Sequence, residues 1–485
     1  MHEARGAWTE RKTMNDVLMG LDLGTSSIKG VLMAGTGEIL AQEQVRTSVF
    51  RPEPGHAEFS AEEHYADVCG LIRSLGGKIP EGSNVKALSM AAASGNTLLA
   101  DRNGKPLTAV ISWMDRRVKD TIKRYLPGFD VQGVHEVVGW PFSGMMSLAH
   151  LSWMKKERPD VYSDAAHVCM NSDYIMHNLT GVWGMDYSTA TTFYLQDQVT
   201  GEHYKPYLDI LDIDNEKLSP LMRSGTVLGP LTEQAAHDTG LDKDTAAVLG
   251  AFDHPCAARA TGSVKPGDLL MSCGTSWVGF FPVNDRNLAL SQNLLVDPFL
   301  QPDGPWGAMF SLPCIGIAID RYIDEILFDR DERDADRYSE FNALAEKAPP
   351  CAEGLVIDLQ GNDDDVIRQG KIFKREFSRE NICRAVMEGA AFLMRERITE
   401  LADAGISASH ITMVGGPAES SVWPQIVADV TGMEIRTGFG RAAGAIGAAI
   451  LAGIGSGVFA DLEQAYTSLT CDVQTVLPDP SAPYL

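Results

Sequence analysis

Short apolar runs alternate along the chain with amphipathic segments, which is the pattern of an α/β protein. Residues 17–31 hold two apolar runs that flank Gly24-Thr25-Ser26-Ser27, and they predict a β-hairpin with a tight turn of small residues. The same patterns predict strands at residues 38–47, 85–93, 98–101, 110–113, 246–251, 354–359 and 410–414. Helices are predicted at residues 60–75, 147–157, 171–179, 205–212, 232–239, 253–260, 315–327, 381–404 and 421–430.

The first hairpin has a counterpart in the second half of the chain. Residues 268–282 again contain an apolar strand, a turn with Gly274-Thr275-Ser276 and a second strand. A turn of Gly, Thr and Ser can hold phosphate oxygens, because glycine allows close approach of backbone N–H groups and the hydroxyls add donors. Two such hairpins suggest two similar halves that face each other across a nucleotide.

One carboxylate, Asp22, lies inside the apolar first strand of the hairpin. An unpaired charge would be costly there. A cation bound near the phosphates would explain it. The alternative is an ordinary hairpin in which Asp22 caps a nearby turn.

The bulk properties limit the possible functions. A chain of 485 residues is too long for one hydrophobic core, so we expect an N-terminal extension (1–16) and two domains of roughly 240 residues (17–250 and 251–485). The net charge of −24 argues against nonspecific binding to nucleic acid or to anionic membranes.

Targeting and redox signals favour a cytoplasmic protein. The eight cysteines form no C-x-x-C pair, which argues against a zinc site or a disulfide framework. The first sixteen residues lack the apolar core of a secretory signal. Residues 442–460 carry no charge, but their Gly and Ala content predicts a buried helix rather than a membrane span.

Asp253 is the candidate for the central chemical role. It ends an apolar strand and begins a helix at the predicted domain boundary, where a carboxylate could take a proton from a hydroxyl that attacks a γ-phosphate. The alternative is a capping aspartate that binds its own helix N–H groups. Its combination with Asp22, the two Gly-Thr-Ser turns and a Gly-Gly turn favours the chemical role.

Two further groups of residues suit small ligands. Trp113, Asp115 and Arg116 follow a strand and combine an aromatic face with charged groups, which suits a polyol; alternatively they begin a helix, with Asp115 as its cap and Arg116 in solvent. Gly415 and Gly416 end a strand just before a helix that starts near Ser420, which is a plausible site for an anion or a nucleotide.

These motifs together resemble those of the FGGY carbohydrate kinases, over residues 17–470 and in the family's order. They are Gly20-Leu-Asp-Leu-Gly-Thr-Ser-Ser-Ile-Lys29, Trp113-Met-Asp-Arg-Arg117, Ala251-Phe-Asp-His254, Cys273-Gly-Thr-Ser276, Glu388-Gly389 and Gly415-Gly-Pro-Ala-Glu-Ser-Ser-Val-Trp-Pro-Gln425. The resemblance implies an α/β fold of two actin-like (ribonuclease H-like) ATPase domains with the active site in the cleft between them.

The resemblance also implies roles for individual residues. It implies ATP and Mg²⁺ as cofactors, with Asp22 at the metal and Asp253 as catalytic base. The implied ATP-binding residues are Gly24, Thr25, Ser26, Gly274, Thr275, Gly316, Asp320, Gly415, Gly416 and Ser420. The implied sugar-binding residues are Asn96, Thr97, Trp113, Asp115, Arg116 and Asp253. We expect a small-molecule sugar as partner, no nucleic acid, no membrane and, for the assembly, a homodimer.

This chain departs from the family's typical motifs in three places. Ser94-Gly-Asn-Thr97 lacks the Gln-Met-His of typical xylulokinases and the Arg-Glu of glycerol kinases. Pro417 follows the Gly-Gly pair, and Asp253-His254-Pro255 replaces the Asp-Asn or Asp-Gln of many members. The first two departures leave the substrate and the adenine contacts open. None of the three removes a group that the chemistry needs.

The sequence favours phosphorylation of a ketopentose such as xylulose at its terminal hydroxyl. Arg116 keeps gluconate or another sugar acid as an alternative, because a guanidinium can bind a carboxylate bidentately, unless Arg116 pairs with Asp115. A sensor that binds ATP and sugar without transfer is an alternative of another class, and Asp22 and Asp253 argue against it. A kinase acting on a carboxylate is a further alternative, but it would need no base such as Asp253.

Overall fold

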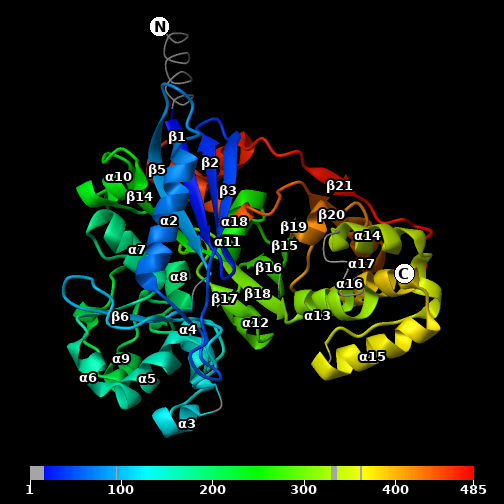
Figure 1. Cartoon of the computed structure of the whole chain (residues 1–485), viewed down its shortest axis with the longest axis horizontal. Helices are drawn as coiled ribbons and strands as arrows, with labels where there is room; N and C mark the ends of the chain where they lie inside the picture. The colour runs from blue at the N-terminus through cyan, green and yellow to red at the C-terminus, as the bar shows by residue number, and fades with distance from the viewer. Residues whose placement is uncertain are drawn as a thin grey trace. The chain divides into compact units, whose positions relative to one another are not determined.

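The computed structural model describes residues 16–484, except residues 94, 120, 275, 329–335 and 361–362. The chain forms two compact units, each assembled from separate stretches of sequence (Figure 1). Unit 1 consists of Met1–Gly262, Leu295–Gly304 and Ala442–Thr470, and unit 2 consists of Ser263–Leu294, Pro305–Arg441 and Cys471–Leu485. The sequence predicted one consecutive stretch per domain, with a division near residue 250. In the structure the chain returns twice to unit 1.

Unit 1 is built around a six-stranded mixed sheet in the order β13-β14-β5-β1-β2-β3. The strands are β1 (Asp16–Leu23), β2 (Ser27–Ala34), β3 (Ile39–Arg46), β5 (Asn84–Ala92), β13 (Val227–Pro230) and β14 (Ala246–Phe252). β1, β5 and β14 are parallel, whereas β2, β3 and β13 pair antiparallel to their neighbours.

Unit 2 repeats this arrangement. Its strands run β21-β20-β19-β15-β16-β18, with β15, β19 and β20 parallel and β16, β18 and β21 antiparallel to their neighbours. The strands are β15 (Asp268–Cys273), β16 (Trp277–Val283), β18 (Trp306–Leu312), β19 (His410–Gly415), β20 (Glu434–Thr437) and β21 (Gln474–Val476). The repeated order of strands confirms the two similar halves that the paired hairpins predicted.

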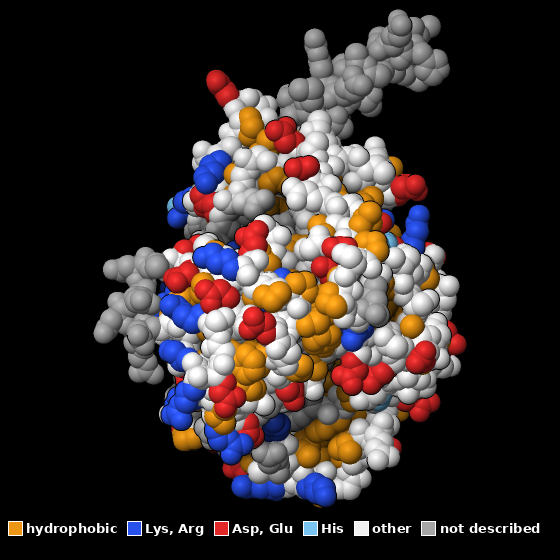
Figure 2. Space-filling model, turned by 90° about the vertical axis from the view of Figure 1, so that its right-hand side faces the viewer, with side chains coloured by type: hydrophobic (Ala, Val, Ile, Leu, Met, Phe, Trp, Pro, Cys, Tyr) orange, Lys and Arg blue, Asp and Glu red, His pale blue; other side chains and the backbone are white. Residues whose placement is uncertain are grey.

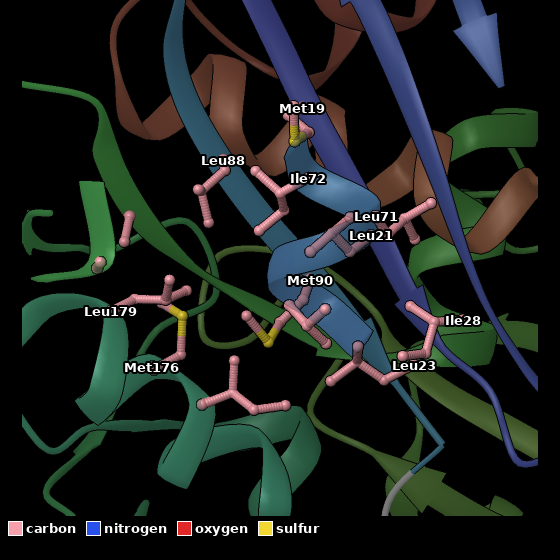
Figure 3. Packing of buried hydrophobic residues seen from close by; sticks show 14 of the residues in the cluster. Met19, Leu21, Leu23, Ile28, Leu71, Ile72, Leu88, Met90, Met176 and Leu179 are labelled. Carbon is pink, nitrogen blue, oxygen red and sulfur yellow. The ribbon is translucent and has the colours of Figure 1, made fainter. Parts of the chain in front are cut away.

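The main core of unit 1 lies between the sheet and helix α2 (Ala61–Gly76), which begins at the predicted cap. Ser60 Oγ accepts from Glu63 N at 3.1 Å. Figure 3 shows Leu71 and Ile72 of α2 beside strand residues that include Leu21, and helix α7 (Asn171–Thr180) adds Met176 and Leu179 to the same cluster. These side chains are fully buried, so the hydrophobic effect fixes α2 and α7 against the strands.

Small residues line the opposite face of β1. Helix α18 (Ala443–Gly455) approaches so closely that a Cβ atom at Gly20 would lie 1.9 Å from the Ala445 carbonyl oxygen. Helix α11 (Asp253–Thr261) approaches α18 equally closely, because a Cβ at Gly447 would lie 1.8 Å from the Cys256 carbonyl oxygen. The buried helix predicted at residues 442–460 is thus confirmed as α18, and backbone contact with two neighbours explains its Gly and Ala content.

The remaining elements are shorter or peripheral. Those of unit 1 are β4 (Glu58–Phe59), β6 (Leu98–Ala100), β7 (Val110–Ile111), α3 (Ile122–Tyr125), α4 (Gly133–Val138), α5 (Ser147–Glu157), α6 (Pro159–Asp164), β8 (His167–Cys169), β9 (Met185–Asp186), α8 (Tyr187–Thr191), β10 (Gln196–Asp197), β11 (Glu202–His203), α9 (Lys205–Leu211), β12 (Leu221–Met222), α10 (Glu233–Thr239), β17 (Leu295–Asp297) and α19 (Leu462–Ser468). Those of unit 2 are α12 (Arg286–Ser291), α13 (Ile315–Arg321), α14 (Arg337–Lys347), α15 (Asp363–Glu376), α16 (Arg379–Asp403) and α17 (Trp423–Thr431). The structure also contains four short 3₁₀ or π segments: η1 (Asn215–Lys217), η2 (Tyr322–Leu327), η3 (Pro350–Gly354) and η4 (Gly416–Glu419).

Most predicted elements are confirmed, and one prediction is wrong. The strand expected at residues 354–359 has no strand pairing, although Leu355, Ile357 and Leu359 alternate as buried residues. The alternation arises from packing against α16, where a Cβ at Gly389 would lie 2.4 Å from the Ile357 carbonyl oxygen. The helix expected from residue 421 begins at Trp423 as α17.

The distribution of charged side chains on the surface and the hydropathy of the helices bear on what the sequence predicted. Figure 2 shows acidic and basic side chains interspersed with apolar ones over one face of the molecule. Among the residues that the structure describes, no helix is both long enough and apolar enough to cross a membrane.

Candidate active site

Three parallel strands of unit 1 end together at one edge of the sheet. Leu23 of β1 and Phe252 of β14 both pair with Ala92 of β5. The residues that follow, Gly24 and Asp253, therefore emerge at the same edge. Ligands of open α/β sheets collect beyond the carboxyl ends of the strands, so the candidate site begins here.

Asp253 is the first residue of α11 and presents one free carboxylate oxygen. Its Oδ1 accepts from the backbone N of His254 at 2.7 Å and lies 2.5 Å from Nδ1 of the same histidine. Within the described residues, Oδ2 has no hydrogen-bond partner, and the side chain is 25% exposed. The helix cap is Phe252, which makes no side-chain cap bond, and among the described helix N–H groups Asp253 accepts from that of His254 alone. This geometry leaves Oδ2 available to a ligand hydroxyl.

Asp22 lies near Asp253 with its carboxylate only 14% exposed. The pKa of Asp22 is raised to about 6: burial is the main cause and the neighbouring Asp253 adds to it, while Lys29 and His254 act in the opposite direction. The Nζ atom of Lys29 is 4.0 Å from Asp22 Oδ2. A second cation beside Asp22 would therefore stabilise the charged form of this carboxylate.

The surroundings of Asp22 fit a metal ion held by few protein ligands. A Cβ at Gly444, in the first turn of α18, would lie 2.9 Å from Asp22 Oδ2, so glycine keeps the space beside the carboxylate open. No group of three acidic, His or Cys side chains that could hold a metal occurs among the described residues. One carboxylate suits Mg²⁺, which commonly keeps several waters and completes its shell with substrate phosphates.

A pocket of unit 1 opens beside this sheet edge. It contains about 460 Å³ of space, part of it solvent, and is lined by Leu23, Gly24, Thr25, Thr47, Ser48, Val49, Phe59, His64, Ala92, Ala93, Asn96, Ser112, Trp113, Asn171 and Ser172. None of these is a carboxylate, Lys or Arg. Burial lowers the pKa of His64 to about 4, so this ring is neutral at pH 7. The described lining is therefore uncharged and combines apolar with polar side chains.

Hydrogen bonds fix the polar side chains of this pocket. Trp113 Nε1 donates to Thr25 Oγ1 at 2.9 Å, which ties the aromatic ring to the first Gly-Thr-Ser turn. Asn96 Oδ1 accepts from Asn171 N at 2.7 Å. The Asn171 side chain approaches His64, while its Oδ1 is buried without a partner. Such an orphan acceptor is what a ligand hydroxyl could satisfy.

Four predicted sugar residues lie outside the lining of this pocket: Asp253, described above, and Thr97, Asp115 and Arg116. Thr97 is fully buried, and its hydroxyl lies 3.0 Å from Nδ1 of His150. Asp115 is also fully buried and accepts hydrogen bonds from Ala57 N and from Arg117, at distances of 2.7–2.9 Å. Arg116 is exposed, and its described hydrogen bonds are made by the backbone alone: its N donates to the Gly55 carbonyl and its carbonyl accepts from Lys119 N. Arg117, rather than Arg116, thus pairs with Asp115.

Unit 2 carries a second, larger pocket at the equivalent edge of its own sheet. Cys273 of β15 pairs with Gly415 of β19, and the residues that follow these strands line a pocket of about 1480 Å³, part of it solvent. The lining includes Gly274, Gly316, Asp320, Gly416 and Ser420, all predicted for ATP, together with Tyr338, Glu419 and Arg441.

Several lining groups of the unit 2 pocket are held in place. Gly415 has a φ of +97°, and a Cβ there would lie 2.4 Å from the Cys273 carbonyl oxygen, so the turn requires glycine. Ser420 Oγ accepts from Val422 N at 3.1 Å, and Tyr338 donates to Asp320 at 2.5 Å. Thr275 lies outside the described residues, and Ser26 is exposed in the first turn.

Sequence reasoning missed four polar residues near the unit 1 site: His64, Asn171, His254 and Asp297. His64 and Asn171 lie on predicted helices and carry no motif, so only the fold brings them to Asn96. His254 stood out as a departure from the family pattern. Asp297, in the sequence Leu-Val-Asp-Pro, reaches unit 1 only because the chain returns there at β17.

Comparisons with known proteins agree with this arrangement. The model of the FGGY family of carbohydrate kinases, N-terminal domain, matches residues 17–259, and that of the C-terminal domain matches residues 269–456. The autoinducer-2 kinase of Yersinia enterocolitica is 28% identical over 480 residues, which cover 93% of this chain and 88% of that protein.

Solved structures show the same fold. A gluconate kinase from Lactobacillus acidophilus matches with a TM-score of 0.83 and 22% identity, covering 96% of this chain and 94% of its own. A xylulose kinase from Rhodospirillum rubrum matches with a TM-score of 0.80 and 23% identity, covering 96% and 95%. The fold is therefore α/β with two actin-like domains, as the sequence predicted.

Proposed function

Because the chain belongs to the FGGY family of carbohydrate kinases, we propose that it transfers the terminal phosphoryl group of ATP to a terminal hydroxyl of a neutral polyol or ketose of about five carbons, with Asp253 as general base. Enzymes of this family are carbohydrate kinases and use ATP as phosphate donor. The proposal concerns the substrate and the residues that act on it.

One observation carries the assignment of the base: Asp253 Oδ1 is occupied by His254, while Oδ2 has no hydrogen-bond partner in the described part of the chain and lies at the edge where β1, β5 and β14 end. In the proposed step, Oδ2 accepts the proton of the substrate hydroxyl as its oxygen forms a bond to the γ-phosphorus. The bond from that phosphorus to the β–γ bridging oxygen breaks, and ADP leaves. Positioning and charge stabilisation supply most of the rate enhancement in such reactions.

Asp22 is the proposed protein ligand of magnesium. Bound Mg²⁺ would neutralise charge that develops on the transferred phosphoryl group. Two neighbouring residues support a metal ion at this position. Gly444 leaves room beside the Asp22 carboxylate, and Lys29 would add a positive charge to that of the ion. The raised pKa of Asp22 means that a cation also removes the energetic cost of its buried charge.

The unit 2 pocket is the proposed binding site of ATP. Its lining combines glycines that allow close backbone approach with Asp320, Tyr338 and Arg441, which offer hydrogen bonds, a ring face and a positive charge. Gly274 and the neighbouring Thr275 belong to the turn that would hold phosphate oxygens. Gly24, Thr25 and Ser26 would contribute from the turn of unit 1.

The uncharged lining of the unit 1 pocket supports a neutral substrate. Asn96, Asn171 and Thr25 offer amides and a hydroxyl, and Trp113 offers an apolar ring face, a mixture that suits vicinal hydroxyls. A sugar acid would require a cation, and the exposed Arg116 is the candidate that the sequence suggested. Arg116 does not line this pocket, which favours the neutral substrate.

A second candidate substrate is autoinducer-2. The relatives that support it are named autoinducer-2 kinases, and the similarity extends over 93% of this chain. Autoinducer-2 and xylulose are therefore the two compounds with which the test begins.

The test is a substrate panel with two variants. ADP release is measured with xylulose, other ketopentoses, polyols, glycerol, gluconate, acetate and autoinducer-2, and the phosphorylated position is identified by NMR. Asp253→Asn should retain ATP binding and lose about 10²–10⁴-fold in kcat. Arg116→Ala should leave a neutral substrate unaffected.

Three outcomes would contradict the proposal. A preference of more than roughly tenfold in kcat/KM for gluconate, abolished in Arg116→Ala, would show a sugar-acid kinase. Binding of ATP and sugar without ADP release would indicate a sensor. Near-normal kcat in Asp253→Asn would remove the base assignment.

A further inference from the structure

Two contacts hold the imidazole of His254. Nδ1 lies 2.5 Å from Asp253 Oδ1, and the ring stacks on Phe252 with centroids 5.4 Å apart and an interplanar angle of 6°. Nε2 is buried and has no hydrogen-bond partner among the described residues. An orphaned buried nitrogen is rare in native proteins and calls for an explanation.

A second orphaned atom belongs to Asp297. This side chain is fully buried; Oδ2 accepts from Ser188 Oγ at 2.7 Å, while Oδ1 has no partner. Ser188 Oγ in turn accepts from the backbone N of Phe252 at 3.1 Å. Asp297 is therefore linked through one hydroxyl to the residue that immediately precedes Asp253.

His254 and Asp297 also act on each other electrostatically. Burial alone would lower the pKa of His254, but Asp253, Asp22 and Asp297 outweigh it and raise the pKa. Burial raises the pKa of Asp297 to about 7, and His254 and Arg259 oppose that rise while Asp186 adds to it. A single ordered water between His254 Nε2 and Asp297 Oδ1 would satisfy both orphaned atoms.

We propose that His254 is a positioning residue for Asp253 and that Asp297 anchors it, so that Oδ1 of the base is immobilised and Oδ2 alone faces the substrate hydroxyl. Asp297 is linked through Ser188 to the Phe252 backbone, and it acts on the His254 ring electrostatically. This inference rests on the proposed role of Asp253 as base.

The physical benefit is a fixed carboxylate plane. Without the imidazole, Oδ1 keeps only the backbone N–H of residue 254, and one hydrogen bond restrains the carboxylate less than two do, because the terminal torsion of aspartate is broad. Misplacement of a catalytic group by about 1 Å can cost about 10²-fold in rate. The expected signature is a loss in kcat with little change in the KM of either substrate.

The experiment compares three histidine variants of the full chain. His254→Phe keeps a ring against Phe252 but has no donor, whereas His254→Asn restores a short donor near the position of Nδ1. The matched control is His167→Phe, which also removes an imidazole stacked on an aromatic ring, here Trp183 at 4.5 Å. Melting temperature, ATP binding, kcat and both KM values are measured for each.

We expect kcat of His254→Phe to fall by about 10–100-fold with both KM values within about twofold of wild type. His254→Asn should regain most of that loss. The control His167→Phe should keep wild-type kcat. Asp297→Asn, which keeps a hydrogen-bonding group for Ser188 but loses the charge that acts on the His254 ring, should lower kcat in the same way by a smaller factor.

Three results would overturn the inference. Wild-type kcat in His254→Phe would show that the ring does not position the base. A rise in the sugar KM at constant kcat would make His254 a substrate contact. An equal loss of kcat in His254→Phe and His254→Asn, accompanied by a fall in melting temperature, would show that His254 serves only the packing of the fold. Asp253→Asn separates this from the proposed function: if that variant stays active, the base assignment itself fails.

Discussion

Replacement of Asp115 by Asn tests whether this carboxylate belongs to the sugar site or to the scaffold. Asp115 Oδ2 accepts from Ala57 N and Arg117 Nη2, and Oδ1 accepts from the backbone N and the Nε of Arg117. The amide nitrogen of Asn would place a donor against two donors and remove the charge opposite Arg117, whose side chain is only 4% exposed.

The structure allows the loss of stability to be estimated. Removal of one partner of a buried ion pair commonly costs about 3–5 kcal/mol. Arg117 retains Glu58 as a second partner and its contact with the Trp153 ring, so the lower end of that range applies. A loss of about 3 kcal/mol corresponds to a fall in melting temperature of roughly 6–12 °C. Arg116→Ala, a change at an exposed neighbour, should leave the melting temperature unchanged.

The pH dependence of this loss has a definite sign. Burial would raise the pKa of Asp115, but the hydrogen bonds from Arg117 and Ala57 outweigh burial and hold the pKa below its usual value. Stability from such a group is present above the unfolded pKa of about 4 and is lost as the pH falls through the lowered folded value. The melting temperatures of wild type and Asp115→Asn should therefore converge in acid.

Differential scanning calorimetry at several pH values measures the melting temperatures of wild type and Asp115→Asn. Steady-state kinetics measure their KM values for sugar and ATP. An unchanged melting temperature together with a large rise in the sugar KM would refute this reasoning, because it would show that Asp115 serves the substrate rather than the scaffold.

Three other changes have expected outcomes. In calorimetry in EDTA at pH 8, Asp22→Asn should be more stable than wild type by about 2–3 kcal/mol, because burial disfavours the charged form of Asp22 and raises its pKa. This difference in stability should vanish by pH 4, where the wild-type carboxyl is protonated. Equal stability of the two proteins at both pH values would contradict this prediction. Gly274→Ala and Thr275→Val should raise the KM for ATP more than that for sugar, and steady-state kinetics with the opposite result would remove this turn from the nucleotide site. Gly447→Ala should prevent folding of unit 1, because its Cβ would lie 1.8 Å from the Cys256 backbone; soluble expression with wild-type melting would contradict that contact.

Local patterns were sufficient to predict most of the fold. The hairpins at residues 17–31 and 268–282 predicted two related halves, and the strand orders of the two sheets agree with this. The failure at residues 354–359 has a physical cause: alternate burial needs only a surface to pack on, whereas a strand also needs a partner for its backbone groups.

The candidate site was predictable where residues follow strands and not where the fold brings distant segments together. Asp22, Asp253 and Trp113 end or follow apolar strands, so their common location was expected. Adjacent residues of equal charge could not be distinguished, and Arg117 instead of Arg116 proved to be the partner of Asp115. Asp297 could not be found, because nothing near it in the sequence signals its return to unit 1.

The backbone contact between β1 and α18 has a consequence for how the molecule is made. A hydrogen bond from Thr470 to the Gly37 carbonyl, within unit 1, spans 433 residues of sequence. On the ribosome, the N-terminal sheet therefore emerges long before the helix that covers its glycine face, and it must wait for almost the whole chain. A fragment cut after residue 262 would expose that face, whereas the same fragment supplied with residues 295–304 and 442–470 as two separate peptides would have every element that unit 1 needs to close.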